Sequence, residues 1–379
     1  MTETTANVGA FSIEFFPPND ERLIEIRRTW DSMLAFCLNS DLPHQSPDFF
    51  HYLQDTEDAL NISLLAVRAG GTRDVVGIVP LRIMPFHLGY SVGQALLVET
   101  GFPSVTILDS EPLLPESPEL YYELFGNILN KYKSCSVICM QQVPTNSFLW
   151  KYIQSSPTLQ RQFLVHVPQG VRNCHRIPVP PTENAYMEKM SAKRCYNLRR
   201  QEKLLSHAGN GILELVRIDK PEQLPLFFSA LDRLAPDRVR KQKHDLTHSE
   251  YFSLAEKGLL LCYVLKCGEQ PCALSMGLRY GPVHRIYKFY HDSALARFSP
   301  GTTLQQMLIR DVISIGGISS IDLGFGSPAY EHTSTNEIEQ RGEITLFRRT
   351  FTNRLHIASH TFFSILVARI KKLRIALTT

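Results

Sequence analysis

One order of helices and strands occurs twice along the chain, and this repetition constrains the fold more than any single motif. In the first half, the spacing of apolar residues predicts helices at 21–36, 46–55 and 117–133, a strand–turn–strand at 61–83 and a strand at 134–143. In the second half, it predicts helices at 220–235, 246–258 and 301–317, a strand–turn–strand at 259–280 and strands at 283–292 and 318–326. The two hairpins lie roughly two hundred residues apart, so the sequence predicts two tandem α/β domains.

A proline-rich stretch at 168–184 separates the two copies. The chain has 379 residues, of which 44% are hydrophobic, and this is enough for two buried cores. We therefore expect an N-terminal domain at 1–175, a C-terminal domain at 176–350 and a helical tail at 351–379. The tail sequence at 362–377 is apolar and basic, which is typical of a packed terminal helix and also of a helix that touches an acidic membrane surface.

The charge of the chain is nearly balanced, with 40 Lys and Arg against 37 Asp and Glu. This balance argues against DNA as a partner and disfavours tRNA. The N-terminal sequence lacks the basic and apolar regions of a secretory signal, and no apolar run is long enough to span a bilayer. The eight cysteines form no Cys-x-x-Cys pair, so we expect no metal site and a cytoplasmic protein with reduced thiols, among them Cys262, Cys267 and Cys272 as buried side chains.

The joint between the predicted strand at 283–292 and the predicted helix at 301–317 has the composition of an anion site. The sequence there is Ala-Arg-Phe-Ser-Pro-Gly-Thr-Thr, and the first turn of a helix has backbone N–H groups without intrahelical acceptors. Gly301, Thr302 and Thr303 would donate to a phosphate, and Arg297 would add a full charge. The alternative is that Ser299 to Gly301 only turn the chain and Thr302 is an ordinary cap.

Two predicted strands present side chains suited to a ligand. In the strand at 318–326, Ile321 and Leu323 alternate with Ser320, Asp322 and Gly324, so one face is polar. A face with an acid and glycines suits a bound ligand, although Asp322 would also serve to order the following loop.

The strand at 283–292 alternates in the same way. Tyr287, Phe289 and His291 would share one face, and Ile286, Lys288 and Tyr290 the other. Tyr290 and His291 would then border a site at the end of this strand.

A basic segment opens the second copy. Over 186–204, basic and aromatic side chains recur at helical spacing and would form one face; they are Lys189, Lys193, Tyr196, Arg200 and Lys203. This face would meet an anionic substrate or the phosphates of a cofactor, or it would be a solvated charged surface.

Three motifs together resemble a known family. They are Lys-Arg-x-x-Asn-Leu-Arg-Arg at 193–200, Arg-Phe-Ser-Pro-Gly-Thr-x-Leu at 297–304 and Asp-Leu-Gly-x-Gly-x-x-x-Tyr at 322–330. The chain resembles, most densely over roughly 183–335, the GNAT-superfamily acyltransferases of the CelD/BcsL type, which are often associated with cellulose and exopolysaccharide biosynthesis and are related to FemAB-like tandem acyltransferases.

The resemblance implies a tandem GNAT fold of the α/β (α+β) class, in which each domain has a mixed, mainly antiparallel central sheet flanked by helices. The N-terminal copy would be degenerate, because its joint at 107–120 is acidic and lacks glycine. Acetyl-CoA or another acyl-CoA would lie between two separating strands of the C-terminal copy. The joint at 297–303 would hold its pyrophosphate.

The implied reaction is N- or O-acylation of a sugar, a polysaccharide precursor or another small envelope-related acceptor by direct attack on the thioester. The candidate residues are Asp322, Glu331 and His291 as proton acceptors and Tyr330 as proton donor; Arg297, Ser299, Gly301, Thr302, Thr303 and Tyr290 for the cofactor; and Lys193, Tyr196 and Arg200 for the substrate. Alternatives are an aminoacyl transferase that uses charged tRNA and a non-catalytic scaffold. A peripheral association with a membrane biosynthesis complex is compatible with the basic tail.

The chain departs from the family pattern in the phosphate loop and at one later position. Arg297 lies one residue further from Gly301 than the family's basic or amide residue does, and Thr303 replaces a small residue. Glu331 stands where a lysine is expected. The first departure leaves phosphate binding intact, because the backbone donors remain, and the second puts the lysine's role in doubt.

Overall fold

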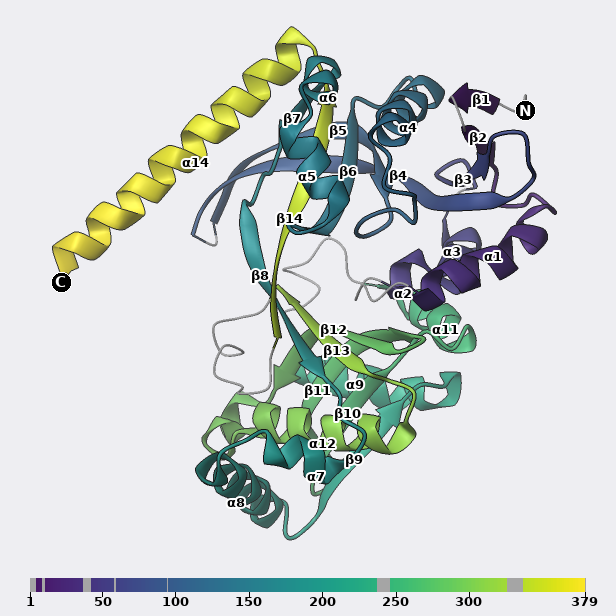
Figure 1. The fold of residues 1–379 in the computed structure, drawn as a ribbon. Helices are drawn as coiled ribbons and strands as arrows, with labels where there is room; N and C mark the ends of the chain where they lie inside the picture. Colours follow the sequence, from purple (N-terminus) through teal and green to yellow (C-terminus); the bar gives the residue numbers. More distant parts are fainter. Residues whose placement is uncertain are drawn as a thin grey trace. The chain divides into compact units, whose positions relative to one another are not determined.

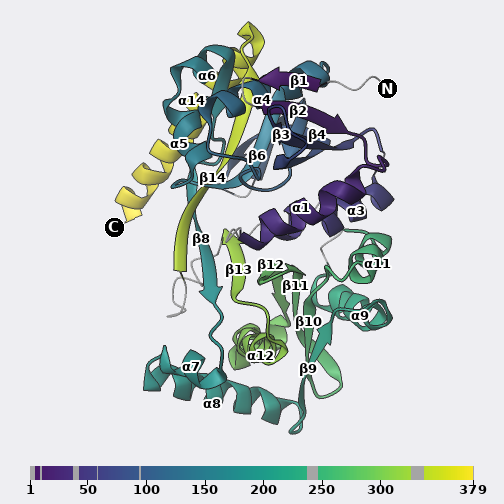
Figure 2. The same ribbon diagram turned by 45° about the vertical axis from the view of Figure 1, so that its right-hand side comes forward.

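A computed structural model describes residues 5–8, 11–36, 42–57, 59–93, 95–236, 246–325 and 337–378 (Figures 1 and 2). The chain forms two compact units. Unit 1 comprises Met1–Met33, Glu57–Arg172 and Gln340–Thr379, and unit 2 comprises Leu34–Thr56 and Asn173–Glu339. Relative to a consecutive division near residue 175, unit 2 gains the segment 34–56 and unit 1 gains the segment from 340 onward.

Unit 1 contains a mixed sheet in the order β1-β2-β3-β4-β5-β6-β14, and β7 also pairs with β14. Its strands are β1 (Thr5–Val8), β2 (Phe11–Phe16), β3 (Ile62–Ala69), β4 (Val75–Val92), β5 (Ala95–Ile107), β6 (Val137–Pro144), β7 (Phe163–His166) and β14 (Glu337–Arg348). Its helices are α1 (Leu23–Phe36), α4 (Pro118–Lys131), α5 (Phe148–Ser155), α6 (Pro157–Gln162) and α14 (Phe351–Thr378). Neighbouring strands are antiparallel except β5 and β6, which are parallel and are joined by α4.

The core of unit 1 forms where α4 packs on the sheet. Leu120, Leu124 and Ile128 recur at helical spacing and are fully buried against Val105 and Ile138 of the parallel strands. Each such side chain stabilises the fold by about 1.5–3 kcal/mol through burial. The sheet of unit 1 therefore depends on α4 for its covered face.

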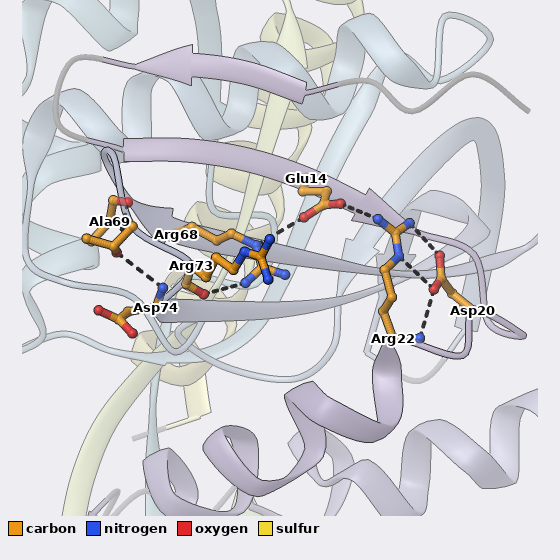
Figure 3. Close-up of polar contacts among 8 residues, drawn as sticks. Glu14, Asp20, Arg22, Arg68, Ala69, Arg73 and Asp74 are labelled. Carbon is orange, nitrogen blue, oxygen red and sulfur yellow. Dashed lines mark hydrogen bonds and ion pairs between the residues drawn. The ribbon is translucent and has the colours of Figure 1, made fainter.

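A surface ion-pair network joins β2, β3 and the start of α1 (Figure 3). Glu14 accepts from Arg22 at 2.7 Å and from Arg68 at 3.1 Å, and Asp20 accepts from Arg22 at 2.7 Å. The hydrogen bond from Arg22 holds the pKa of Asp20 below its usual value. The network fixes how the chain leaves β2 for α1, and its carboxylates are partly buried, since the side chains of Glu14 and Asp20 are each 13% exposed.

In unit 2 the sheet strands follow the order β8-β13-β12-β11-β10-β9 and are again mixed in direction. Its strands are β8 (Val171–Pro178), β9 (Leu213–Ile218), β10 (Cys262–Cys267), β11 (Gln270–Tyr280), β12 (Val283–His291) and β13 (Ser320–Phe325). Its helices are α2 (Leu42–Gln45), α3 (Pro47–Thr56), α7 (Glu183–Glu188), α8 (Ala192–Ala208), η1 (Pro221–Gln223), α9 (Leu224–Leu234), α11 (His248–Glu256), η2 (Ser293–Phe298) and α12 (Pro300–Ile315). The strands are antiparallel except β12 and β13, which are parallel.

The core of unit 2 repeats the arrangement of unit 1. Leu304, Leu308 and Val312 of α12 are fully buried and pack with Tyr263 of β10 and Ile321 of β13. Because this face of α12 is covered by the sheet, the helix is held with its first turn at the end of β12.

The predicted fold class is confirmed: both sheets are mixed, mainly antiparallel and flanked by helices. The predicted helices at 21–36, 46–55, 117–133 and 301–317 are α1, α3, α4 and α12. Cys262 and Cys272 are buried as predicted, and burial raises the pKa of each to about 12, whereas Cys267 is half-buried.

The continuous helix predicted over 186–204 is wrong. The segment forms α7 and then α8, because the hydroxyl of Ser191 accepts from the backbone N–H of Arg194 and starts a new helix. Lys189 consequently lies between the two helices and not on the face that contains Lys193.

None of the helices in the described part of the chain has the length and apolar content that crossing a bilayer requires.

Candidate functional site

The parallel strands β12 and β13 separate soon after they begin. They pair only where Val283, His284 and Arg285 lie beside Ser320, Ile321 and Asp322. Beyond this point β12 follows β11 as far as His291, while β13 pairs with β8. Within the described residues, the two strands therefore diverge toward the first turn of α12.

A β-bulge at Tyr287 accompanies this separation. Ile286 lies opposite Gly277 and Lys288 opposite Met276, so Tyr287 is the extra residue of β12. A side chain at Gly277 would approach the carbonyl oxygen of Arg285 to 2.5 Å, so this position requires glycine. The predicted alternation along β12 is wrong because the bulge shifts it by one: Ile286 and Phe289 pack in the same core cluster.

His284 supports β12 below the point of separation. It is fully buried, its Nδ1 lies 3.2 Å from the carbonyl oxygen of Leu278, and its ring meets Tyr263 edge to face. Burial lowers the pKa of His284 to about 4, so the ring is neutral at neutral pH. His284 thus adds no charge to the core beneath the paired part of the two strands.

The first turn of α12 has backbone donors without acceptors. Ser299 precedes it in the left-handed conformation (φ 55°), and its hydroxyl makes no capping bond but accepts from Gln201 at 3.3 Å. Pro300 has no N–H, and within the described residues nothing accepts from the N–H groups of Gly301 and Thr302. These two donors, at the positive end of a 16-residue helix, can bind an anion.

Two side chains lie near this turn. Arg297 is exposed, and its guanidinium lies 4.6 Å from the ring centre of Phe298. The His291 ring lies 3.8 Å from where a Cβ on Gly301 would be, so His291 lies beside the two donors. Thr303 does not face outward: it is buried, and its hydroxyl donates to the carbonyl oxygen of Ser299 at 3.3 Å.

Asp322 lies on the face of β13 opposite Ile321. It is almost fully buried, and its carboxylate accepts from the backbone N–H of Gly324 at 2.6 Å. Gly324 has a φ of +63°, so this bond fixes a turn within the strand. Arg285 of β12 and Arg176 of β8 are its neighbours in register on either side. This geometry makes Asp322 a residue that orders β13 where the strands part.

Sequence reasoning missed a contact between Tyr287 of β12 and His44 of α2. The hydroxyl of Tyr287 lies 2.9 Å from Nε2 of His44 in α2, and the Arg285 guanidinium lies 5.5 Å from the Tyr287 ring centre. Tyr287 is 42% exposed. No local signal identifies this pair, because His44 and Tyr287 are far apart in the sequence and only tertiary packing joins them.

The other predicted residues are placed as follows. Lys193, Tyr196 and Arg200 are exposed on α8, and Tyr290 is half-buried on β12. Tyr330 and Glu331 lie outside the described residues. In the parts of unit 2 that the structure describes, Arg297, Gly301, Thr302 and His291 come together around the start of α12.

A groove of about 650 Å³ lies along α8 and α12, away from this turn. Its charged lining residues are Glu183, Arg199, Glu202, Lys203 and Arg310. Arg310 pairs with Glu183 and Glu202, each at 3.0 Å. Both carboxylates of the groove pair with one of its three lysine and arginine side chains, Arg310, and acidic side chains lining the groove make it less suited to an anion than the start of α12. Within the described residues, no three His, Cys, Asp or Glu side chains gather to hold a metal ion.

The corresponding region of unit 1 is built differently. α4 begins with Ser117, whose hydroxyl accepts from the N–H of Leu120 at 3.2 Å and donates to Glu119 at 3.1 Å. The parallel pair β5–β6 continues past Ile107, because the N–H of Gln141 donates to the carbonyl oxygen of Asp109 at 2.9 Å. A capped, acidic first turn beside strands that stay together offers no anion site.

These two units define a class of fold: each has a parallel strand pair, joined through a helix, within a mainly antiparallel sheet. Solved structures share it. A crystal structure of FemX is similar at a TM-score of 0.58 and 11% identity, covering 84% of this chain and 95% of that one. A tandem GNAT protein from the clavulanic acid biosynthesis pathway is similar at a TM-score of 0.51 and 12% identity, covering 88% and 98%. At such identities the likeness establishes the fold alone.

The family comparison is specific to unit 2. Residues 192–332 match the model of the acetyltransferase (GNAT) domain family. This segment begins at α8 and contains β12, α12 and β13, so the match covers the separating strands and the uncapped first turn. A search of curated proteins found no match.

Proposed function

We propose that unit 2 is an acyl-CoA-dependent N- or O-acyltransferase. One observation carries the proposal: in the domain that matches the acetyltransferase family, the strand pair β12–β13 opens toward two unaccepted backbone N–H groups, those of Gly301 and Thr302. An acyl-CoA has a pyrophosphate at one end of an extended arm and a thioester at the other. Such a molecule suits an anion site at the end of two separating strands.

In this proposal the chain's own groups bind the donor and set its position. The N–H groups of Gly301 and Thr302 donate to the pyrophosphate, and Arg297 adds charge from the exposed side. His291, beside Gly301, lies within reach of the same phosphates. The arm then extends between β12 and β13 toward the paired base at Arg285 and Asp322.

The bound acyl-CoA supplies an activated acyl group on sulfur. An amine acceptor is protonated at neutral pH and must lose a proton before it attacks, and a hydroxyl acceptor also benefits from a base. Asp322 is the described candidate for this role, and Tyr330 and Glu331 complete the proposed set, whereas His291, a further candidate from the sequence, would serve the phosphates because it lies beside Gly301. Much of the rate acceleration would come from holding donor and acceptor together.

The acceptor proposed is a sugar, a polysaccharide precursor or another small envelope-related molecule, and the reaction is placed in the cytoplasm. Lys193, Tyr196 and Arg200 are exposed on α8 and would bind an anionic part of the acceptor. This identification follows the CelD/BcsL resemblance of the three motifs.

The test combines binding and turnover. Calorimetry with acetyl-CoA should show saturable binding, and release of free CoA should depend on an added amino sugar or hydroxyl-bearing saccharide. Absence of acetyl-CoA binding would contradict the proposal. If the protein instead bound charged tRNA with a steep dependence on salt, the site would be assigned to aminoacyl transfer.

A further inference from the structure

The long terminal helix α14 of unit 1 contacts the sheet along only one stripe. Asn353 and His360 are buried, and Ser359 meets the hydroxyl of Tyr90 at 2.7 Å. The Tyr90 ring also packs against the rings of His360 and Phe363, each at 5.3 Å. Figures 1 and 2 show α14 as a single straight helix along the outside of the unit.

A second stripe of α14 is apolar and exposed. It consists of Leu355, Phe362, Leu366 and Ile370, which are 62%, 70%, 45% and 56% exposed. Their spacing of seven, four and four residues places them on one helix face. We call these four residues the outer stripe. Exposed apolar side chains that recur on one face mark a surface that binds something apolar.

The neighbouring β4–β5 hairpin enlarges this apolar surface. Its tip exposes Val92, Leu96, Leu97 and Val98, which are between 47% and 58% exposed. Tyr90, two residues from Val92, is the residue that joins the hairpin to α14. Two apolar regions of unit 1 therefore lie next to one another.

The charge of α14 selects among partners. Its sequence from Phe351 to Thr378 contains Arg354, Arg369, Lys371, Lys372 and Arg374 and no Asp or Glu. Arg354 and Arg369 are exposed. An apolar stripe on a purely basic helix matches the surface of an anionic bilayer, where headgroups attract the cations and acyl chains take up the apolar side chains. A second copy would bring like charges together, so self-association is disfavoured.

We propose that α14 binds the surface of an anionic membrane through the outer stripe, with the hairpin tip beside it. The helix would lie in the plane of the interface with its apolar face about 5–10 Å deep. The inference is independent of the acyltransferase proposal.

The test is vesicle flotation with the full chain. Equimolar phosphatidylglycerol and phosphatidylcholine vesicles should carry the protein, phosphatidylcholine alone should not, and added salt should weaken binding. Phe362→Ser with Leu366→Ser should weaken binding by about tenfold or more. The control Ile24→Ser removes a residue that is 77% exposed on α1 and should leave binding unchanged.

Thermal unfolding checks that the double variant folds, which is expected because both side chains are exposed. Three results would overturn the proposal. They are equal binding to both vesicle types, unchanged binding by the double variant, or a wild-type dimer in light scattering that the double variant dissociates. The last result would assign the outer stripe to a second copy of the chain.

Discussion

In each unit a helix connects the two strands of a parallel pair: α4 connects β5 and β6, and α12 connects β12 and β13. The first turns of these two helices differ in hydrogen bonding and charge. In unit 1, Ser117 caps α4 and Glu119 adds a carboxylate to its first turn. In unit 2, Ser299 makes no cap on α12, and no acidic residue occupies the first turn. The helix dipole is available to a ligand only in unit 2, because unit 1 satisfies its own donors and repels anions.

The parallel strand pairs also differ, because the pair in unit 1 stays together for longer than the pair in unit 2. In unit 1, Gln141 bonds to Asp109, and the hydroxyl of Ser110 donates to the carbonyl oxygen of Gln142 at 3.3 Å, so the strands stay together past Ile107. In unit 2, the pairing ends at Arg285 and Asp322. Both differences favour a ligand in unit 2. Within one fold, a few residues at a helix start and a strand end decide which copy has a site.

The largest expected effect comes from giving α12 an acid like that of α4. Gly301→Asp should weaken acetyl-CoA binding by about 100-fold or more, because the carboxylate repels phosphate and takes up the free N–H groups. The new side chain has room, since the nearest atom to a Cβ there is 3.8 Å away. Calorimetry measures the affinity.

The matched control for this variant is Glu119→Gln in unit 1. It should leave acetyl-CoA affinity unchanged, because α4 is not the proposed site. Comparable losses in the two variants would show that the two helix starts do not differ in function.

Acid should destabilise both units. Burial lowers the pKa of His284 in unit 2 to about 4, and burial with the nearby His360 lowers that of His166 in unit 1 to about 4, from an ordinary 6.5. Between these values the unfolded chain binds more protons than the folded one. Stability is therefore fully present above pH 6.5 and should fall by about 1–2 kcal/mol per histidine as the pH drops toward 4.

Urea unfolding across this pH range measures the effect. His166→Asn removes one of the histidines whose pKa is lowered in the folded chain, so the fall in stability with acidification should be shallower than in the wild type. Stability that stays constant or rises as the pH drops from 6.5 to 4 would contradict the assignment of neutral buried rings.

A smaller loss is expected at Arg297. Arg297→Ala should weaken acetyl-CoA binding by about tenfold, or about 1.4 kcal/mol, since an exposed guanidinium adds charge and the backbone donors remain. The difference in acetyl-CoA affinity between the variant and the wild type should become smaller at high salt. Arg161→Ala, an exposed arginine in unit 1, is the control, and an equal loss there would mean that only overall charge matters.

The smallest expected effects are on the free energy of unfolding, and they compare the serine before α4 with the serine before α12. Ser117→Ala should lower the free energy of unfolding by about 1 kcal/mol, because it removes a capping bond. Ser299→Ala should lower it by less than about 0.5 kcal/mol, because that hydroxyl caps nothing. Similar losses in urea unfolding would indicate that α12 is capped in solution, and the anion site would lose its basis.

Local patterns in the sequence were sufficient to predict the helices and the joint that form the candidate site. The apolar spacing of Leu304, Leu308 and Val312 located α12, and the apolar spacing over 117–133 located α4. The joint at Arg297 to Thr302 could be recognised because donors at a helix start are a local property.

Features that depend on pairing between distant segments could not be predicted. The bulge at Tyr287 arises from the register with Gly277, so alternation along β12 alone gave the wrong faces. The contact of Tyr287 with His44 requires the segment 34–56 to pack in unit 2. Asp322 was predicted to face a ligand or to order a loop, and its bond to Gly324 supports the ordering role.

A crystal structure of the protein with CoA tests the central claim most directly. The account predicts pyrophosphate density within hydrogen-bond distance of the backbone N–H groups of Gly301 and Thr302, with the pantetheine arm between β12 and β13. Pyrophosphate density at Ser117 of α4, or CoA bound away from both helix starts, would contradict it.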